Sequence, residues 1–183
     1  MGMPASAWVS SGERETPFDR LFTAEYSRVV AIARHVLGDP HEAEDVAQDV
    51  FCSFYRLHSS EAAYAAAWLH RASAHAALNV VRGKKRRRQR ESDQAMSDAA
   101  LSRGSEPYVD PQHAVETDES RREVREALGR IPEKSAAVLV LRYSGLSYAE
   151  VAQALGVGTG QVGTLLRRAE VALRKELSHE TSR

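Results

Sequence analysis

The sequence has little of what stabilises extracellular or membrane proteins. Cys52 is the only cysteine among 183 residues, which excludes an intramolecular disulfide and fits a reducing compartment. No apolar run approaches the roughly 18 residues needed to cross a bilayer, and the N-terminus lacks the basic and apolar pattern of a secretion signal. We therefore expect a cytoplasmic protein without membrane contacts.

Signals of catalysis are also scarce. The chain shows no cysteine cluster and no nucleophile paired with a base, and the glycines between positions 156 and 163 do not follow a strand, as those of a phosphate-binding loop would. A bundle metal site needs Glu-x-x-His motifs on facing helices, but the sequence offers one, Glu176 to His179, near the C-terminus. We expect no enzyme activity, no catalytic residue, no cofactor or metal, and no small-molecule substrate; a metal-dependent helical enzyme is the alternative.

The sequence shows no alternation of apolar and polar residues, as a β-strand would, and no internal repeat. The expected fold is therefore all-α. The 25 basic and 25 acidic residues cancel overall but are segregated. Residues 82–90 carry seven Lys/Arg and no acid, whereas 91–119 carry eight Asp/Glu and one Arg. This inversion predicts two small helical domains joined by a flexible acidic linker. The expected divisions are a disordered N-terminus (1–16), a helical domain (17–90), the linker (91–118), a helix-turn-helix domain (119–178) and a disordered tail (179–183).

Helix signals in the first domain are strong. Thr16 and Pro17 form an N-cap and first helical position, Gly38 ends that helix, and Asp39 caps a second helix at once. A connection this short makes the two helices antiparallel neighbours. An alanine-rich third helix is predicted over about 61–81.

The second domain contains a pattern typical of a helix-turn-helix. After helices predicted at 121–130 and 133–143, Ser147 and Glu150 form a capping box and Gly156 supplies a left-handed turn residue. Thr159 then opens a last helix, whose Val162 packs back. A plain helical hairpin with a basic outer face is the alternative. The outer side of the last helix would present Thr159, Gln161, Thr164, Arg167 and Arg168 to a DNA major groove.

The third helix carries polar side chains along one side, where the basic run 82–90 extends it. Arg71, His75, Asn79 and Arg82 recur at i, i+4, i+8 and i+11, a stripe able to contact bases and backbone together. Tyr64 and Trp68 could stack an unpaired base, although core packing explains Trp68 equally well.

The second helix has an acidic face. Glu42, Asp45 and Asp49 lie at i, i+3 and i+7, which suits a solvated surface, a metal site or a docking surface for a basic partner.

The order of these parts resembles the extracytoplasmic-function (ECF) sigma factors of bacterial RNA polymerase, over roughly residues 18–90 and 118–177. Ala43-Glu-Asp-Val-Ala-Gln-Asp-Val-Phe51 is similar to the family's region 2.2. The stretch from Trp68 to Arg82 is similar to regions 2.3 and 2.4. Ile131 to Tyr143, with the helix-turn-helix, is similar to region 4.

The resemblance implies a promoter-specificity subunit that binds core polymerase, recognises the minus-35 and minus-10 elements and helps to melt the promoter. Implied partners are the polymerase β′ clamp helices and β flap, double- and single-stranded promoter DNA, and an anti-sigma factor, which is common in the family. The implied core-binding residues are Glu42, Asp45, Gln48 and Asp49. The implied minus-10 residues are Tyr64, Trp68, Arg71, His75, Asn79, Arg82, Lys84, Lys85 and Arg86. The implied minus-35 residues are Thr159, Gln161, Thr164, Arg167 and Arg168.

Four positions depart from the family pattern. The family usually has Asn at position 75 and Asp at 79, where this chain has His75 and Asn79, and often has basic residues in place of Gly163 and Leu165. The promoter sequence read by the family therefore does not transfer. A stand-alone helix-turn-helix regulator is the alternative function.

Overall fold

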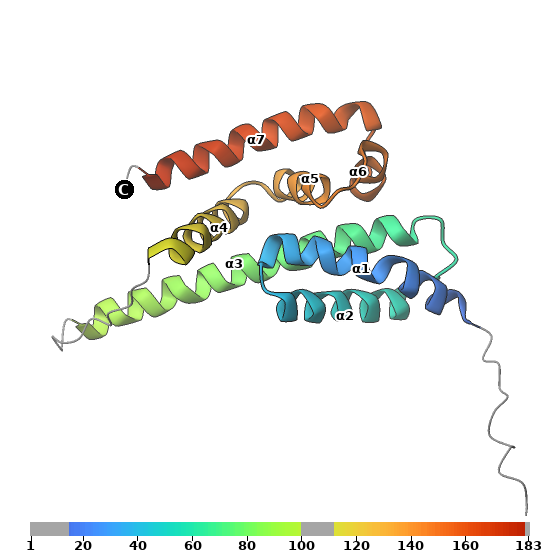
Figure 1. Ribbon diagram of the computed structural model, residues 1–183, viewed down its shortest axis with the longest axis horizontal. Helices are drawn as coiled ribbons and strands as arrows, with labels where there is room; N and C mark the ends of the chain where they lie inside the picture. The colour runs from blue at the N-terminus through green and yellow to red at the C-terminus, as the bar shows by residue number, and fades with distance from the viewer. Residues whose placement is uncertain (1–14, 100–111, 182–183) are drawn as a thin grey trace, which may run out of the picture.

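The computed structural model describes residues 15–99 and 112–181, and the side chains of residues 15–91 and 119–179. Over these residues the fold is entirely helical (Figure 1), so the all-α prediction is confirmed. The helices are α1 (Pro17–Leu37), α2 (Pro40–Leu57), α3 (Ala65–Ala99), α4 (Gln112–Arg130), α5 (Glu133–Tyr143), α6 (Tyr148–Leu155) and α7 (Thr159–Thr181).

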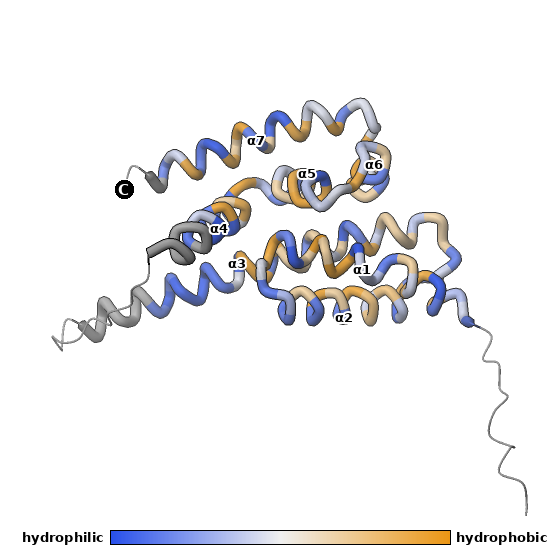
Figure 2. The backbone as a smooth tube through the Cα atoms, viewed as in Figure 1, coloured by the Kyte–Doolittle hydropathy of each residue, from blue (hydrophilic) through white to orange (hydrophobic). Residues whose placement is uncertain are grey.

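Local capping sets the first two helices. The Thr16 side chain accepts a hydrogen bond from the Asp19 backbone N–H, and the Asp19 carboxylate accepts one from the Thr16 N–H. Gly38 ends α1 at φ 77°, and Asp39 caps α2. The two helices pack side by side with their apolar stripes inward, as predicted (Figures 1 and 2).

Helix α3 differs from its predicted extent. It begins at Ala65 instead of near 61, and it continues through the basic run to Ala99. Lys and Arg are good helix formers, and carboxylates on other helices offset part of the crowded positive charge, as with Glu42 beside Lys84. The stretch from Glu91 to Ala99, expected to be linker, is therefore helical.

Helix α4 also begins in the predicted linker, at Gln112 rather than near Arg121. Both expected linker ends, 90/91 and 118/119, fall inside helices, and residues 100–111 lie outside the described residues. So do residues 1–14, most of the predicted N-terminal segment. In the predicted tail, α7 continues to Thr181.

The helix-turn-helix has the predicted construction. Ser147 and Glu150 form the capping box of α6, and Gly156 ends that helix at φ 64°. Val151, Ala152 and Val162 are buried where α6 and α7 cross. Helix α5 packs against both and completes the second helical unit.

The two helical units lie against each other. Helices α4, α5 and α6 contact α3, and α5 also contacts α1. Buried residues from both units, from Val29 to Ala169, form one continuous apolar cluster. The sequence predicts only a flexible linker between the two units. Their packing against each other is therefore a feature that the sequence did not predict. No helix within the described ranges is long and apolar enough to span a membrane.

Candidate nucleic-acid and polymerase interface

The polar face of α3 is divided between solvent and the second helical unit. Arg71 and Asn79 are exposed. His75 contacts the Glu133 carboxylate on α5 through its Nδ1 atom. Arg82 donates from Nε to the Gly129 carbonyl oxygen on α4 at 3.2 Å. The four predicted residues therefore do lie along α3, but two of them, His75 and Arg82, contact α5 and α4 in this arrangement.

An aromatic cluster stands where α2 leads into α3. Trp68 is partly buried, with its ring centroid 4.6 Å from that of His58 and 5.5 Å from that of Phe54. Tyr64 is 50% exposed, and its hydroxyl lies 3.4 Å from His58 Nδ1. Trp68 thus packs within the first helical unit, whereas Tyr64 stays half exposed to solvent. No local pattern in the sequence indicates His58, because only the packing of α2 on α3 brings its ring next to Trp68.

The basic residues that follow on α3 are unequally engaged. Lys84 bonds both carboxylate oxygens of Glu42 on α2. Lys85 is partly buried, and Arg86 is exposed. Arg88 forms a 2.9 Å ion pair with Glu126 on α4. Because exposed pairs of this kind contribute only about 0–1 kcal/mol each, they do not prevent the run from meeting a polyanion.

The outer face of α7 is open. All its predicted DNA-contact side chains are exposed, namely Thr159, Gln161, Thr164, Arg167 and Arg168. The Gln161 side-chain oxygen accepts a hydrogen bond from the Gly158 backbone N–H at 3.1 Å, which leaves its amide nitrogen as the group that can donate outward. The face has the donors needed to read base edges and backbone.

The acidic face of α2 is exposed on the other unit. Asp45, Gln48 and Asp49 point to solvent, and Glu42 at the start of the stripe is partly buried beside Lys84. Hydrogen bonds from the backbone N–H groups of Glu42 and His41 lower the pKa of the capping Asp39. Nowhere in the described part of the chain do three His, Cys, Asp or Glu side chains gather as a metal site requires. The expectation that no metal binds stays a prediction.

A further polar contact joins the units at α6. Arg28 of α1 pairs with the Glu150 carboxylate at 2.8 Å. Within the first unit, the buried His70 of α3 lies 2.7 Å from the Glu25 carboxylate of α1. The pKa of Glu150 is lowered first by the Ser147 backbone N–H, then by the Ser147 side chain and by Arg28. Glu150 therefore links the cap of the helix-turn-helix to the first unit.

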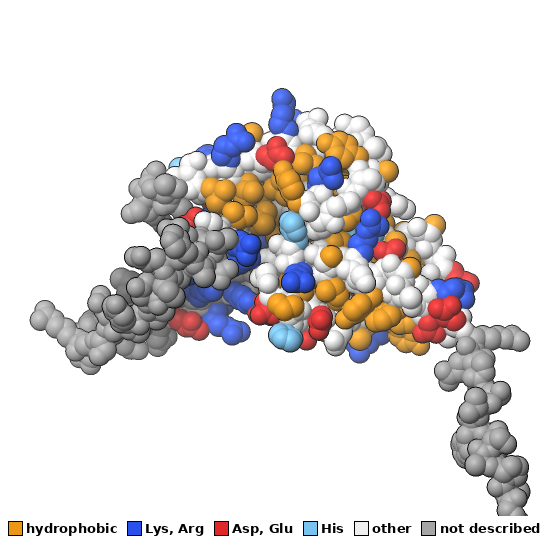
Figure 3. Space-filling view, in the orientation of Figure 1, with side chains coloured by type: hydrophobic (Ala, Val, Ile, Leu, Met, Phe, Trp, Pro, Cys, Tyr) orange, Lys and Arg blue, Asp and Glu red, His pale blue; other side chains and the backbone are white. Residues whose placement is uncertain are grey.

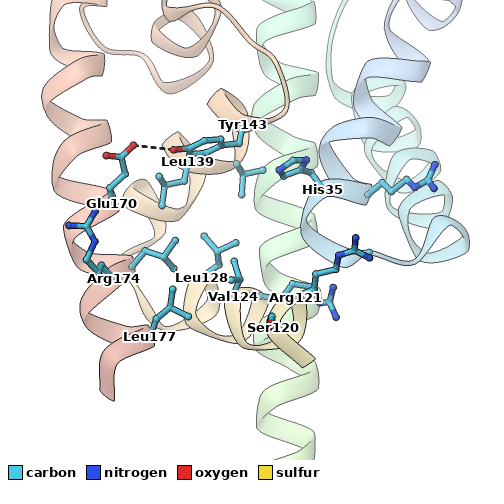
Figure 4. A pocket seen from close by; sticks show the side chains of 15 residues that line it. His35, Ser120, Arg121, Val124, Leu128, Leu139, Tyr143, Glu170, Arg174 and Leu177 are labelled. Carbon is cyan, nitrogen blue, oxygen red and sulfur yellow. Dashed lines mark hydrogen bonds between the residues drawn. The ribbon is translucent and has the colours of Figure 1, made fainter. Parts of the chain in front are cut away.

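An apolar groove opens between α7, α4 and α5, with the end of α1 at its edge. Its cavity measures about 1000 Å³, and apolar side chains show at the surface there (Figure 3). Leu128, Leu139 and Leu177 project into it (Figure 4). At one side the Tyr143 hydroxyl donates to Glu170 at 3.1 Å, which raises the pKa of Tyr143. A groove with several apolar side chains in its wall is a candidate docking surface for an amphipathic segment.

Known proteins share both units. The family model for sigma-70 region 2 matches residues 21–87, and that for sigma-70 region 4 matches residues 121–173. RNA polymerase sigma-H factor of Pseudomonas aeruginosa is 31% identical over 179 residues, which covers 92% of this chain and 90% of that protein. The ECF sigma factor SigW of Bacillus subtilis is 29% identical, over 82% of this chain and 83% of that protein.

The chain belongs to the ECF RNA polymerase sigma factors. Members of this family are promoter-specificity subunits of RNA polymerase. A solved structure of CnrH in complex with the cytosolic domain of CnrY has a TM-score of 0.50 at 20% identity, and the match covers 88% of each chain. At that identity it supports the fold alone.

Membership gives the two units their names. Helices α1 to α3 carry region 2 of the sigma factor, and α4 to α7 carry region 4. The α3 face, the α2 acidic stripe and the α7 outer face thus lie within the matched regions. The contacts of His75 and Arg82 are contacts between region 2 and region 4.

Proposed function

We propose that this chain binds core RNA polymerase, recognises minus-35 and minus-10 promoter elements, and helps to melt the promoter. The observation that carries the proposal is the presence of both sigma regions in one chain, each with its polar face accessible or covered only by the other region. Neither face carries an arrangement for covalent chemistry, so the proposed role is binding rather than catalysis. A partner of RNA polymerase would act in the bacterial cytoplasm.

Region 4 would hold duplex DNA through the outer face of α7. Gln161 and Thr164 lie near the helix N-terminus, where base edges are read, while Arg167 and Arg168 reach guanine or phosphate. Region 2 would hold the opened strand. Stacking on an exposed ring such as Tyr64 contributes about 1–3 kcal/mol per base, which helps to offset the cost of unstacking.

Two binding regions in one chain strengthen each other. Once region 4 holds the minus-35 element, the minus-10 element meets region 2 at a high effective concentration, provided that the connection spans the two sites. Spanning them requires the regions to move apart, because α4 and α5 now contact His75 and Arg82. We therefore propose that binding to core polymerase separates the regions.

The acidic stripe of α2 would bind the β′ clamp helices. Asp45 and Asp49 are exposed and lie one helical turn apart, so a basic partner surface could neutralise both. The groove between α4, α5 and α7 would receive an amphipathic segment, such as one from the β flap or from an anti-sigma factor. Its rim carries Arg34, Arg121 and Arg174, which favours a segment with acidic residues along its edge.

Core binding by full-length variants tests the proposal. Asp45→Asn with Asp49→Asn should weaken binding to core polymerase about ten-fold or more, since removing charges of an interface slows association and hastens release. Glu123→Gln, an exposed acid on α4, is the matched control and should bind as the original does. If the double variant binds core polymerase unchanged, the docking surface is wrong. If the original chain does not bind core at all, the stand-alone regulator replaces the proposal.

A further inference from the structure

Two basic helix faces oppose each other where α3 meets α4. Lys84, Lys85 and Arg88 occupy one side of α3, at i, i+1 and i+4, and Arg122 and Arg125 occupy one side of α4. They line a cavity of about 120 Å³. Figure 3 shows Lys and Arg side chains gathered at this part of the surface. The cavity shares Arg125 with the apolar groove and contains Lys84 and Lys85 of the implied minus-10 set. It contains no residue of the outer face of α7 or of the aromatic cluster.

The positive charges around the cavity are only partly neutralised from outside it, where Lys84 pairs with Glu42 and Arg122 lies 3.3 Å from Glu119. Glu126 is the one carboxylate in its lining, and it is shared between Arg88 at 2.9 Å and Arg122 at 3.9 Å. Among the described residues, Lys85 and Arg125 have no ion pair or hydrogen bond. Like charges held together in a recess repel one another and concentrate anions from solution.

The size and chemistry of the cavity define its ligand. At about 30 Å³ per water molecule, the cavity of about 120 Å³ has the volume of about four waters, which admits a small anion such as phosphate. Guanidinium groups bind phosphate oxygens in pairs, and Arg122 and Arg125 present two of them opposite Lys85. We propose that this cavity binds a diphosphate group, carried by inorganic pyrophosphate or by a nucleoside diphosphate.

A DNA backbone fits this place less well. The cavity exists only while α3 and α4 lie together, and the same packing covers Arg82 with the Gly129 carbonyl. DNA that reached the α3 face would have to part the two helices and so dismantle the cavity. A compact anion, by contrast, would bridge them.

Bridging has a consequence for regulation, which rests on the proposed function. A ligand that binds only the packed arrangement stabilises it by mass action. Diphosphate would therefore keep regions 2 and 4 together and weaken binding to core polymerase. By reciprocity, core polymerase would lower the affinity for diphosphate.

Calorimetric titration of the full chain tests the site. We expect saturable one-to-one binding of inorganic pyrophosphate in magnesium-free buffer at constant ionic strength. Arg125→Gln should weaken it about ten-fold, which corresponds to about 1.4 kcal/mol. Arg56→Gln, the same change on an exposed arginine of α2, should leave the affinity within two-fold. If ADP binds and AMP does not, the ligand is the diphosphate group of a nucleotide. If only pyrophosphate binds, the ligand is the inorganic anion.

Several results would overturn the proposal. These are no saturable binding, equal weakening by Arg125→Gln and Arg56→Gln, or binding of duplex DNA but not pyrophosphate at this cluster. Circular dichroism melting of each variant separates loss of the site from loss of the fold. Because the titration contains no polymerase, its failure leaves the sigma function standing, and failure of core binding leaves the anion site standing.

Discussion

Single residues on α3 differ in what surrounds them, although they share one helix face. Asn79 and Arg71 are exposed, whereas His75 contacts Glu133 and Arg82 contacts Gly129. The spacing in the sequence suffices to predict the face. Their partners lie 58 and 47 residues further along the chain, and only tertiary packing brings them near. Exposure therefore separates the α3 residues that are open to solvent in this arrangement from those that region 4 contacts.

Asn79→Ala tests an available residue. A base contact is worth about 1–3 kcal/mol, so affinity for a single-stranded minus-10 oligonucleotide within the holoenzyme should fall about 5- to 150-fold. The melting temperature should hardly change, because the side chain is exposed and makes no packing contact to lose. Fluorescence anisotropy of a labelled oligonucleotide measures the affinity. Gln153→Ala, an exposed amide on α6, is the control, and equal binding by both variants would remove Asn79 from the site.

Glu150 predicts a pH dependence. Its pKa is lowered in the folded chain, chiefly by the Ser147 N–H, so its stabilisation is complete above the unfolded pKa and is lost as the pH falls through the folded one. Below about pH 5 the cap of α6 and the contact to Arg28 should weaken.

The measurement is the melting temperature between pH 7 and pH 3. Glu150→Gln should lower it at pH 7 and reduce its fall on acidification. The pKa values of Asp19 and Asp39 are also lowered. These two residues therefore contribute the same fall in melting temperature to the original chain and to the variant. An unchanged fall in the variant would show that Glu150 does not contribute.

At the scale of elements, helix ends were predictable where capping is local. Thr16, Asp39, Ser147 and Gly156 act within a few residues of themselves, and the structure has all four as predicted. The extents of α3 and α4 were not predictable in that way. A run of like charge suggests a solvated tail. In the structure the basic run is part of α3, and carboxylates of α2 and α4 that lie far away in the sequence pair with it.

Two glycines of the helix-turn-helix should respond oppositely to alanine. Gly156 has φ 64° and nothing near its missing side chain, so Gly156→Ala incurs backbone strain alone, about 1 kcal/mol. Gly163 lies inside α7, where an added methyl would meet Tyr148 at 3.8 Å. Gly163→Ala should therefore stabilise by about 1 kcal/mol. Thermal unfolding should move by about 2–4 °C down and up, respectively, and a shift of the same sign for both would contradict the turn geometry.

At the scale of the molecule, the sequence indicated two units and their order but not their packing. The charge inversion after residue 90 falls inside α3, so it does not coincide with an end of a helix. Leu139 and Val140 are buried in the apolar cluster, and nothing in the spacing of apolar residues shows that this cluster continues across both units. The covering of half the α3 face by region 4 follows from this packing.

Gly129→Leu should force the units apart. A side chain at position 129 would begin 3.4 Å from Val81 and 3.7 Å from Arg82, and overpacking of this kind costs about 1–3 kcal/mol. Labels on the exposed Cys52 and on a Lys175→Cys variant report the separation by energy transfer. Gly83→Leu, where nothing lies within 4 Å, is the matched control. Lower energy transfer in Gly129→Leu but not in Gly83→Leu supports the packing of the two units. Equal energy transfer in both variants contradicts it.

Transcription from a random promoter library tests the central claim most directly. The full chain, reconstituted with core polymerase, should select discrete start sites that share two elements at constant spacing. Substituting Arg167 and Arg168 with Ala should erase the upstream element, and Asn79→Ala should alter the downstream one. Selection of a single element that persists without core polymerase would contradict the account and identify the chain as a free-standing DNA-binding regulator.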